Sequence, residues 1–152
     1  MAPPNTVEAK KFFSVEDANR ALPLVKAIVG DIVRQYQIVQ ELQARLAAVA
    51  SSERRRPSRD PYSEELAQSQ AELAAEEAKL LSYIEELKRL GVELKGPDGL
   101  CDFPNLRDGR EVCLCWRLGE AEVLHWHEVN AGFAGRQLLT PQPAPRAGQR
   151  SK

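Results

Sequence analysis

The chain has 152 residues, with 21 basic and 22 acidic side chains that give a formal net charge of −1. This length fits one domain with a buried core, and the even charge balance gives no general attraction to nucleic acid or to an acidic membrane. The sequence has no apolar run long enough to span a bilayer and no signal-peptide core, so a cytoplasmic protein is expected.

A long helix is the first element that the sequence predicts. Residues 1–11 are mainly polar, contain two prolines, and are expected to be flexible. Ser14 can cap a helix start because its hydroxyl can accept a hydrogen bond from a free backbone N–H. Pro23 is unfavourable inside a helix, so the pattern predicts a short turn over 15–21, a kink or restart, and then helix to about Ala50.

The apolar residues of this helix form a seam with alternating steps of three and four. Its members are Val25, Ile28, Ile32, Val39, Leu42, Leu46 and Val49, with Gln35 as the only polar residue in the series. Val29, Val33 and Tyr36 widen the apolar stripe. A wide stripe needs more than one packing partner, so we expect part of it to be buried across a subunit interface.

A second helix is predicted over 62–90, after a polar loop at 51–61. The loop holds the arginine run 54–59, which is flanked by acids and lacks an aromatic side chain for base stacking, so nucleic-acid binding is not expected. The second helix repeats a leucine every seventh residue: Leu66, Leu73, Leu80 and Leu87. Two helices of similar length with a short connection predict an antiparallel hairpin roughly 40 Å long.

The pattern changes to β after Gly91. Short runs separated by turn sequences predict a small antiparallel meander: Val92–Lys95, Leu100–Phe103, Arg110–Arg117 and Ala121–Val129. The expected fold class is α+β. We expect a single domain over 12–138, with the helical hairpin at 12–90 and the meander and a C-terminal loop at 91–138. Residues 139–152 are proline-rich and basic and are expected to be disordered.

Side-chain alternation predicts which residues share a face of the sheet. The large residues should lie together against the helices: Leu114, Trp116, Leu124 and Trp126. This requires a connection of odd length, and a three-residue loop over 117–119 satisfies it. The opposite face then gathers Cys113, Cys115, His125 and His127. A two-residue turn at Asp108–Gly109 would bring Asp102 to this face as well.

Two chemistries suit this set of side chains. A His-x-His pair on a strand can bind zinc, because both imidazoles reach one point and a cysteine can add a soft ligand. The candidate metal ligands are therefore His125, His127, Cys113 and Cys115. A thiol-dependent enzyme would instead use Cys113 with His125 as its base. The structural alternative is that the cysteines are small core residues and the histidines form hydrogen bonds. The odd count of three cysteines predicts free thiols.

Five short segments occur in order along the chain. They are FSVEDANRALP at 13–23, DFP at 102–104, LCWRLGE at 114–120, WHE at 126–128 and GFAGR at 132–136. Together they resemble a bacterial family of uncharacterised proteins, domain of unknown function 2203, over about residues 12–138. The resemblance implies a small bacterial cytosolic protein and no particular activity, cofactor or catalytic residue. The family usually has a bulky residue at the position of His125. The resemblance therefore favours His127 over His125 as a metal ligand.

The charged and titratable residues of these segments are the candidate catalytic residues. They are His127, Glu128, Glu120, Asp102, Arg117 and Arg136. Arg136 could hold an anion or a carboxylate through two parallel hydrogen bonds. The simpler interpretation is a set of intramolecular ion pairs that tie the C-terminal segment to the sheet.

Strong helical seams without a catalytic signature favour a non-enzymatic scaffold or interaction module. We expect a homodimer through the helical hairpin, with an unidentified protein as a further partner and without membrane or nucleic acid. The alternative is a metal-binding or thiol-dependent, hydrolase-like enzyme with its site on the face of His125, His127 and Cys113, and zinc as the metal. The near-neutral charge disfavours a transcription-linked regulator.

Overall fold

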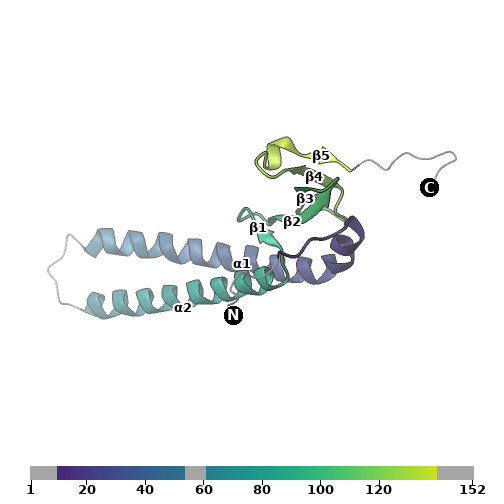
Figure 1. Ribbon diagram of the computed structural model, residues 1–152. Coiled ribbons are helices and arrows are strands. Elements are labelled where there is room, and N and C mark those ends of the chain that lie inside the picture. The colour runs from purple at the N-terminus through teal and green to yellow at the C-terminus, as the bar shows by residue number, and fades with distance from the viewer. Residues whose placement is uncertain (1–9, 54–60, 140–152) are drawn as a thin grey trace, which may run out of the picture.

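The computed structural model describes residues 10–53 and 61–139 and confirms the predicted α+β architecture (Figure 1). Two helices, α1 (Val15–Glu53) and α2 (Pro61–Arg89), form the hairpin. Five strands and one short 3-10 helix follow: β1 (Glu93–Leu94), β2 (Leu100–Arg107), β3 (Arg110–Arg117), β4 (His125–Glu128), η1 (Phe133–Gly135) and β5 (Gln137–Leu138).

The predictions for the arginine run at 54–59 and for both ends of the chain lie outside the described residues. Within the described ranges, neither helix has the length and apolar character needed to cross a membrane.

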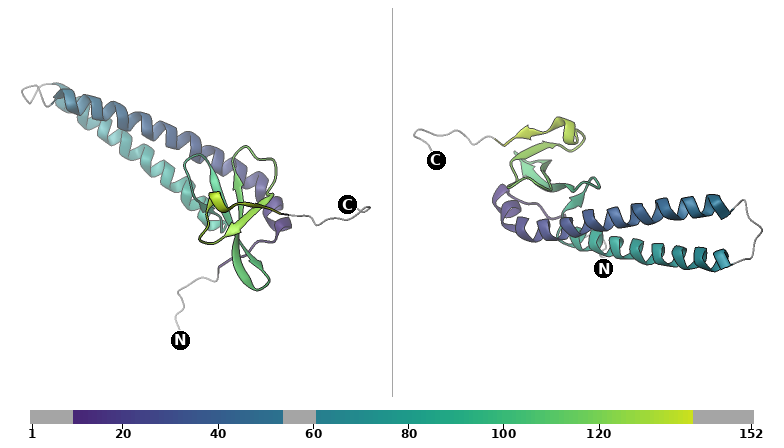
Figure 2. Two further views of the ribbon diagram at one scale, coloured as in Figure 1. Left: turned by 90° about the horizontal axis from the view of Figure 1, so that it is seen from above. Right: turned by 180° about the vertical axis from the view of Figure 1, so that it is seen from behind.

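Helix α1 begins with a reciprocal cap. The Asp17 N–H donates to Ser14 Oγ at 2.9 Å, and the Ser14 N–H donates to Asp17 Oδ2 at 3.1 Å. The predicted restart at Pro23 is wrong, because α1 continues through it, although the first turns curve away from the axis of the rest (Figure 2). Packing on both sides of Pro23 offsets its missing backbone donor, since the flanking residues Ala18, Leu22 and Val25 are buried.

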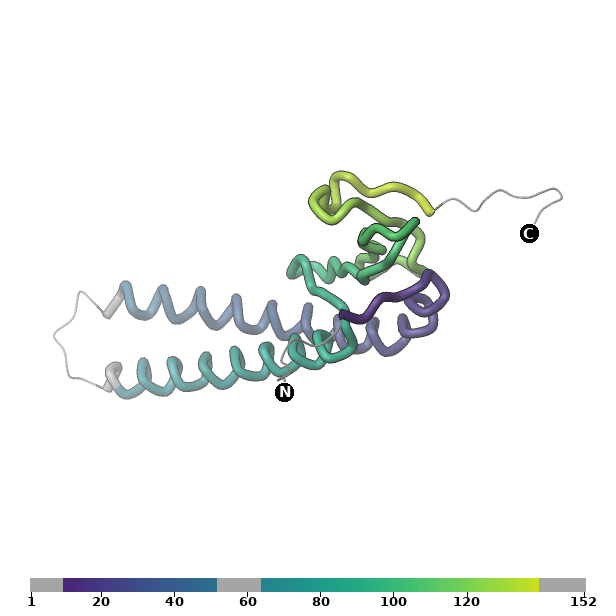
Figure 3. Tube along the Cα trace, viewed as in Figure 1, coloured from purple at the N-terminus to yellow at the C-terminus, as the bar shows by residue number. Residues whose placement is uncertain are grey.

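The sheet packs against one end of the hairpin, and the rest of the hairpin projects beyond it (Figure 3). Val29 is buried in the core beneath the sheet, and Val33 packs against that core. Gly99, which follows the β1–β2 turn, lies close above these two valines. A methyl group placed at its Cβ position would stand 3.1 Å from the Val29 side chain and 3.4 Å from the Val33 side chain. The chain's own sheet therefore covers this part of the stripe, and the expected subunit interface remains a prediction.

The strands are antiparallel and lie in sequence order, β1 to β5. The predicted two-residue turn at Asp108–Gly109 is confirmed, and both residues have positive φ, 53° and 77°. Strand β2 extends beyond Phe103 through Pro104, further than predicted. The Pro104 carbonyl accepts a hydrogen bond from the Phe13 N–H at 2.7 Å, so this residue turns its backbone groups away from β3. Its missing N–H therefore costs no bond in the β2–β3 ladder.

The connection between β3 and β4 is longer than the predicted three-residue loop, because β3 ends at Arg117 and β4 begins at His125. Side-chain bonds set this length. The Trp116 Nε1–H donates to the Glu120 carbonyl at 2.9 Å, and the Val123 N–H donates to Asn19 Oδ1 at 2.7 Å. The loop thus detours to α1, and Leu124 lies exposed before the strand starts, contrary to its predicted packing against the helices.

Candidate functional site

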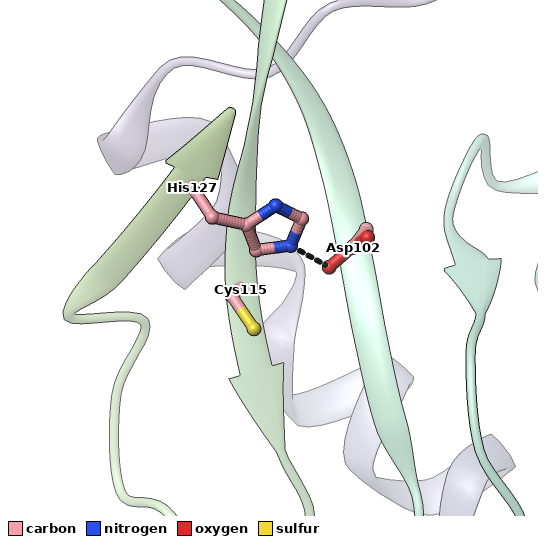
Figure 4. A group of neighbouring side chains, drawn as sticks. All are labelled: Asp102, Cys115 and His127. Carbon is pink, nitrogen blue, oxygen red and sulfur yellow. Dashed lines mark hydrogen bonds and ion pairs between the residues drawn. The ribbon is translucent and has the colours of Figure 1, made fainter. Parts of the chain in front are cut away.

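A polar cluster lies on the face of the sheet that points away from the helices. Asp102 pairs with Cys115, Cys115 with His125, and Cys113 with His127, so all of them share one face as predicted. Three of these residues converge: the side-chain ligand atoms of Asp102, Cys115 and His127 all lie within 4.8 Å of one another (Figure 4). All three residues are buried.

His127 faces an oxygen atom at each ring nitrogen. Its Nδ1 lies 2.7 Å from the Glu128 carbonyl oxygen, and its Nε2 lies 3.0 Å from Asp102 Oδ1. A carbonyl oxygen only accepts, so Nδ1 carries a hydrogen and donates it. Nε2 and the Asp102 carboxylate are then two acceptors, and their close contact is favourable only with a proton or another cation between them.

The C-terminal segment covers the cluster through Arg136. Its guanidinium donates two hydrogen bonds of 2.7 Å to the two carboxylate oxygens of Glu120. Its Nε–H points to Cys115 Sγ at 3.4 Å. The hydrogen bond from Arg136 is the main reason why the pKa of Glu120 lies below its usual value. Arg136 therefore joins the segment after β4 to the loop after β3, as an intramolecular ion pair.

The other candidate residues lie outside this cluster. Glu128 pairs with Arg110 at 3.1 Å, and Arg117 pairs with Asp98 at 3.2 Å; both pairs are largely exposed. His125 lies beside Cys115, and its buried Nδ1 has no hydrogen-bond partner in the described structure. The side chains that converge are thus one histidine, one cysteine and one carboxylate, and His125 is not among them.

A family model described as "Uncharacterized conserved protein (DUF2203)" matches residues 11–139. The chain belongs to the DUF2203 family. Neither a curated protein nor a solved structure matches it. The segments that carry the sequence resemblance supply every member of the cluster and its cover: Asp102, Cys115, Glu120, His127 and Arg136.

The sheet of this DUF2203 protein was only partly predictable around the cluster. The 3-10 helix η1 and strand β5 were expected to be loop, but the ion pair expected to tie this segment to the sheet is present between Arg136 and Glu120. Its signal in the sequence was the GFAGR segment, where Arg136 was a candidate for holding a carboxylate.

The three cysteines are free, as predicted, and buried. Burial raises the pKa of Cys101 and of Cys113 to about 12, with the Asp102 charge as a further cause. Burial also raises the pKa of Cys115, although the hydrogen bond from Arg136 opposes that shift. A nucleophilic cysteine needs a thiolate, so these surroundings disfavour a thiol-dependent enzyme.

We therefore expect the thiols of the folded protein to react slowly with a thiol reagent such as Ellman's reagent at pH 8. A pKa about three units above the usual value leaves Cys101 and Cys113 with about a thousandth of the ordinary thiolate, and burial limits access further. After unfolding in guanidinium chloride, all three thiols should react rapidly. A native thiol that reacts as fast as the unfolded ones would instead support a thiol-dependent enzyme.

Proposed function

We propose that this DUF2203 protein is a non-enzymatic interaction module that forms a homodimer through the outer face of α2. Two features support a non-enzymatic role. The cysteines are buried with raised pKa values, and the histidine–aspartate pair is buried with both partners already bound to each other. The projecting part of the hairpin then offers the surface for a partner (Figure 3).

The outer face of α2 carries a continuous stripe of small and apolar side chains, and this observation carries the proposal. Its members recur with alternating steps of four and three residues, and all are exposed: Ala67, Ala71, Ala74, Ala78 and Leu81. Leu81 is 60% exposed, so most of this large apolar side chain is open to a partner. The stripe flanks the leucine seam with α1, because Ala67, Ala74 and Leu81 each directly follow a seam leucine and so lie about 100° further around the helix. A shallow hollow at its start is lined by Glu64, Glu65, Ala67, Gln68 and Ala71.

A second copy of the same stripe fits this face. Alanine side chains let two helix backbones approach closely, and an antiparallel pair of α2 helices is symmetric about its centre. With Ala74 at that centre, Leu81 of one copy faces Ala67 of the other, so a large side chain meets a small one. The same pairing brings the acidic first turn of each α2 to within about one turn of the basic last turn of the other.

The test is a charge at the centre of the stripe. Ala74→Glu should convert the dimer to a monomer, because the symmetry places two buried carboxylates side by side and weakens association by at least about 100-fold. Size-exclusion chromatography with light scattering measures the mass. Ala44→Glu is the matched control: it adds the same charge to an exposed position of α1 and should leave the dimer intact. A wild-type monomer, or an Ala74→Glu dimer, contradicts the proposal.

A further inference from the structure

We propose that Asp102, Cys115 and His127 form a zinc site that joins β2, β3 and β4. This goes beyond the dimer proposal, since the cluster lies on the sheet and away from the outer face of α2. One carboxylate, one thiol and one imidazole are the donor types that zinc binds in proteins, whereas calcium and magnesium require oxygen donors throughout. The three ligands come from three adjacent strands, so the backbone ladder fixes their positions.

The spacing of the donor atoms is close to that of a tetrahedral site. Zinc bonds to nitrogen and oxygen of about 2.0–2.1 Å place these two donors roughly 3.3 Å apart, and a longer bond to sulfur places it about 3.6 Å from either. The observed distance from His127 Nε2 to Asp102 Oδ1 is 3.0 Å. No pair of donor atoms in the cluster is more than 4.8 Å apart. Small side-chain rotations, mainly at Cys115, therefore suffice to form the site.

The hydrogen bonding of His127 prepares its Nε2 for a metal. Metal-binding histidines usually donate their other ring N–H to a carbonyl or carboxylate, and here Nδ1 donates to the Glu128 carbonyl oxygen at 2.7 Å. The Nε2 lone pair then points at the Asp102 carboxylate, where two acceptors require a cation between them. Zinc can take the place of the proton in this contact.

The charges around the cluster balance when zinc is bound. A carboxylate and a thiolate offset the two charges of the ion, and His127 binds as a neutral ligand. Arg136 adds no net charge, because Glu120 holds its guanidinium with two hydrogen bonds of 2.7 Å. The Arg136 Nε–H, 3.4 Å from Cys115 Sγ, is placed to donate to the thiolate from outside the ligand set.

Direct zinc loading tests the site in the full-length protein without a histidine tag. Because the donors are buried, the reduced protein is refolded from denaturant with a small excess of zinc, desalted and analysed for metal by mass spectrometry. The wild type should retain one zinc per chain. Asp102→Asn, Cys115→Ser and His127→Gln should each weaken zinc binding by at least about 100-fold and lose the ion on desalting.

Matched controls separate ligation from damage to the fold. Cys113→Ser and Cys101→Ser change buried free cysteines of the same sheet and should retain zinc, with circular dichroism confirming folding throughout. Cobalt loading adds a second readout, since a thiolate-to-cobalt charge-transfer absorption should appear in the wild type and in Cys113→Ser but not in Cys115→Ser. A wild type that retains no zinc, or a Cys115→Ser protein that retains zinc and the absorption, overturns the proposal.

Discussion

Trp116→Ala is expected to lower the free energy of unfolding by about 3–5 kcal/mol, a large share of the stability of a domain this size. Trp116 is fully buried in the core between the sheet and the helices, so its loss leaves a cavity that the neighbouring strands cannot close. Urea unfolding followed by circular dichroism measures the change. Leu124→Ala, at an exposed leucine on the same chain segment, should change stability by less than about 0.5 kcal/mol.

Trp116 also connects the core to the polar cluster. Its Nε1–H donates to the Glu120 carbonyl at 2.9 Å, and the Arg117 N–H donates to Glu120 Oε1 at 2.9 Å. These two bonds orient Glu120 toward Arg136. Trp116→Phe keeps most of the packing but loses the indole donor, so we expect a smaller loss of about 1–2 kcal/mol. Equal losses in the alanine and phenylalanine variants would show that packing is not the main contribution of this side chain.

The parts of the fold that sequence could predict depend on local periodicity. The leucine repeat of α2 and the seam of α1 specify the hairpin without knowledge of the rest of the chain. The Asp108–Gly109 turn was equally local, because a two-residue hairpin turn requires positive φ at both positions. The second partner of the α1 stripe was not local: the sheet that covers Val29 comes from far along the chain.

The face of each candidate ligand was predictable although the register was not. Any connection of odd length puts Cys115 and His125 on the same face, so the error in loop length left the face unchanged. The convergence of His127 on Asp102 depends on the register and on how far His127 reaches across β3. That reach is set by side-chain packing, which residue spacing does not encode.

Arg136→Met should lower the free energy of unfolding by about 2–3 kcal/mol at pH 7, because it leaves the Glu120 carboxylate without its partner in a partly buried place. The side chains of this pair are only 13% and 30% exposed, and their contact is bidentate. Arg110→Met is the matched control. Its pair with Glu128 has side chains that are 56% and 45% exposed, so its loss should cost less than about 1 kcal/mol.

The effect of Arg136→Met should also depend on pH. The hydrogen bond from Arg136 lowers the pKa of Glu120 from its usual 4.5 in the folded protein. A carboxylate with a lowered pKa stabilises the folded state fully at pH values above its usual pKa of 4.5. This contribution is lost as the pH falls through the lowered pKa of the folded state. The stability difference between wild type and Arg136→Met should thus be largest at neutral pH and shrink in acid. Urea unfolding at a series of pH values measures this stability difference. A difference that stays constant with pH would show that the ion pair does not hold the C-terminal segment on the sheet. A loss of stability no larger than the loss in Arg110→Met would show the same.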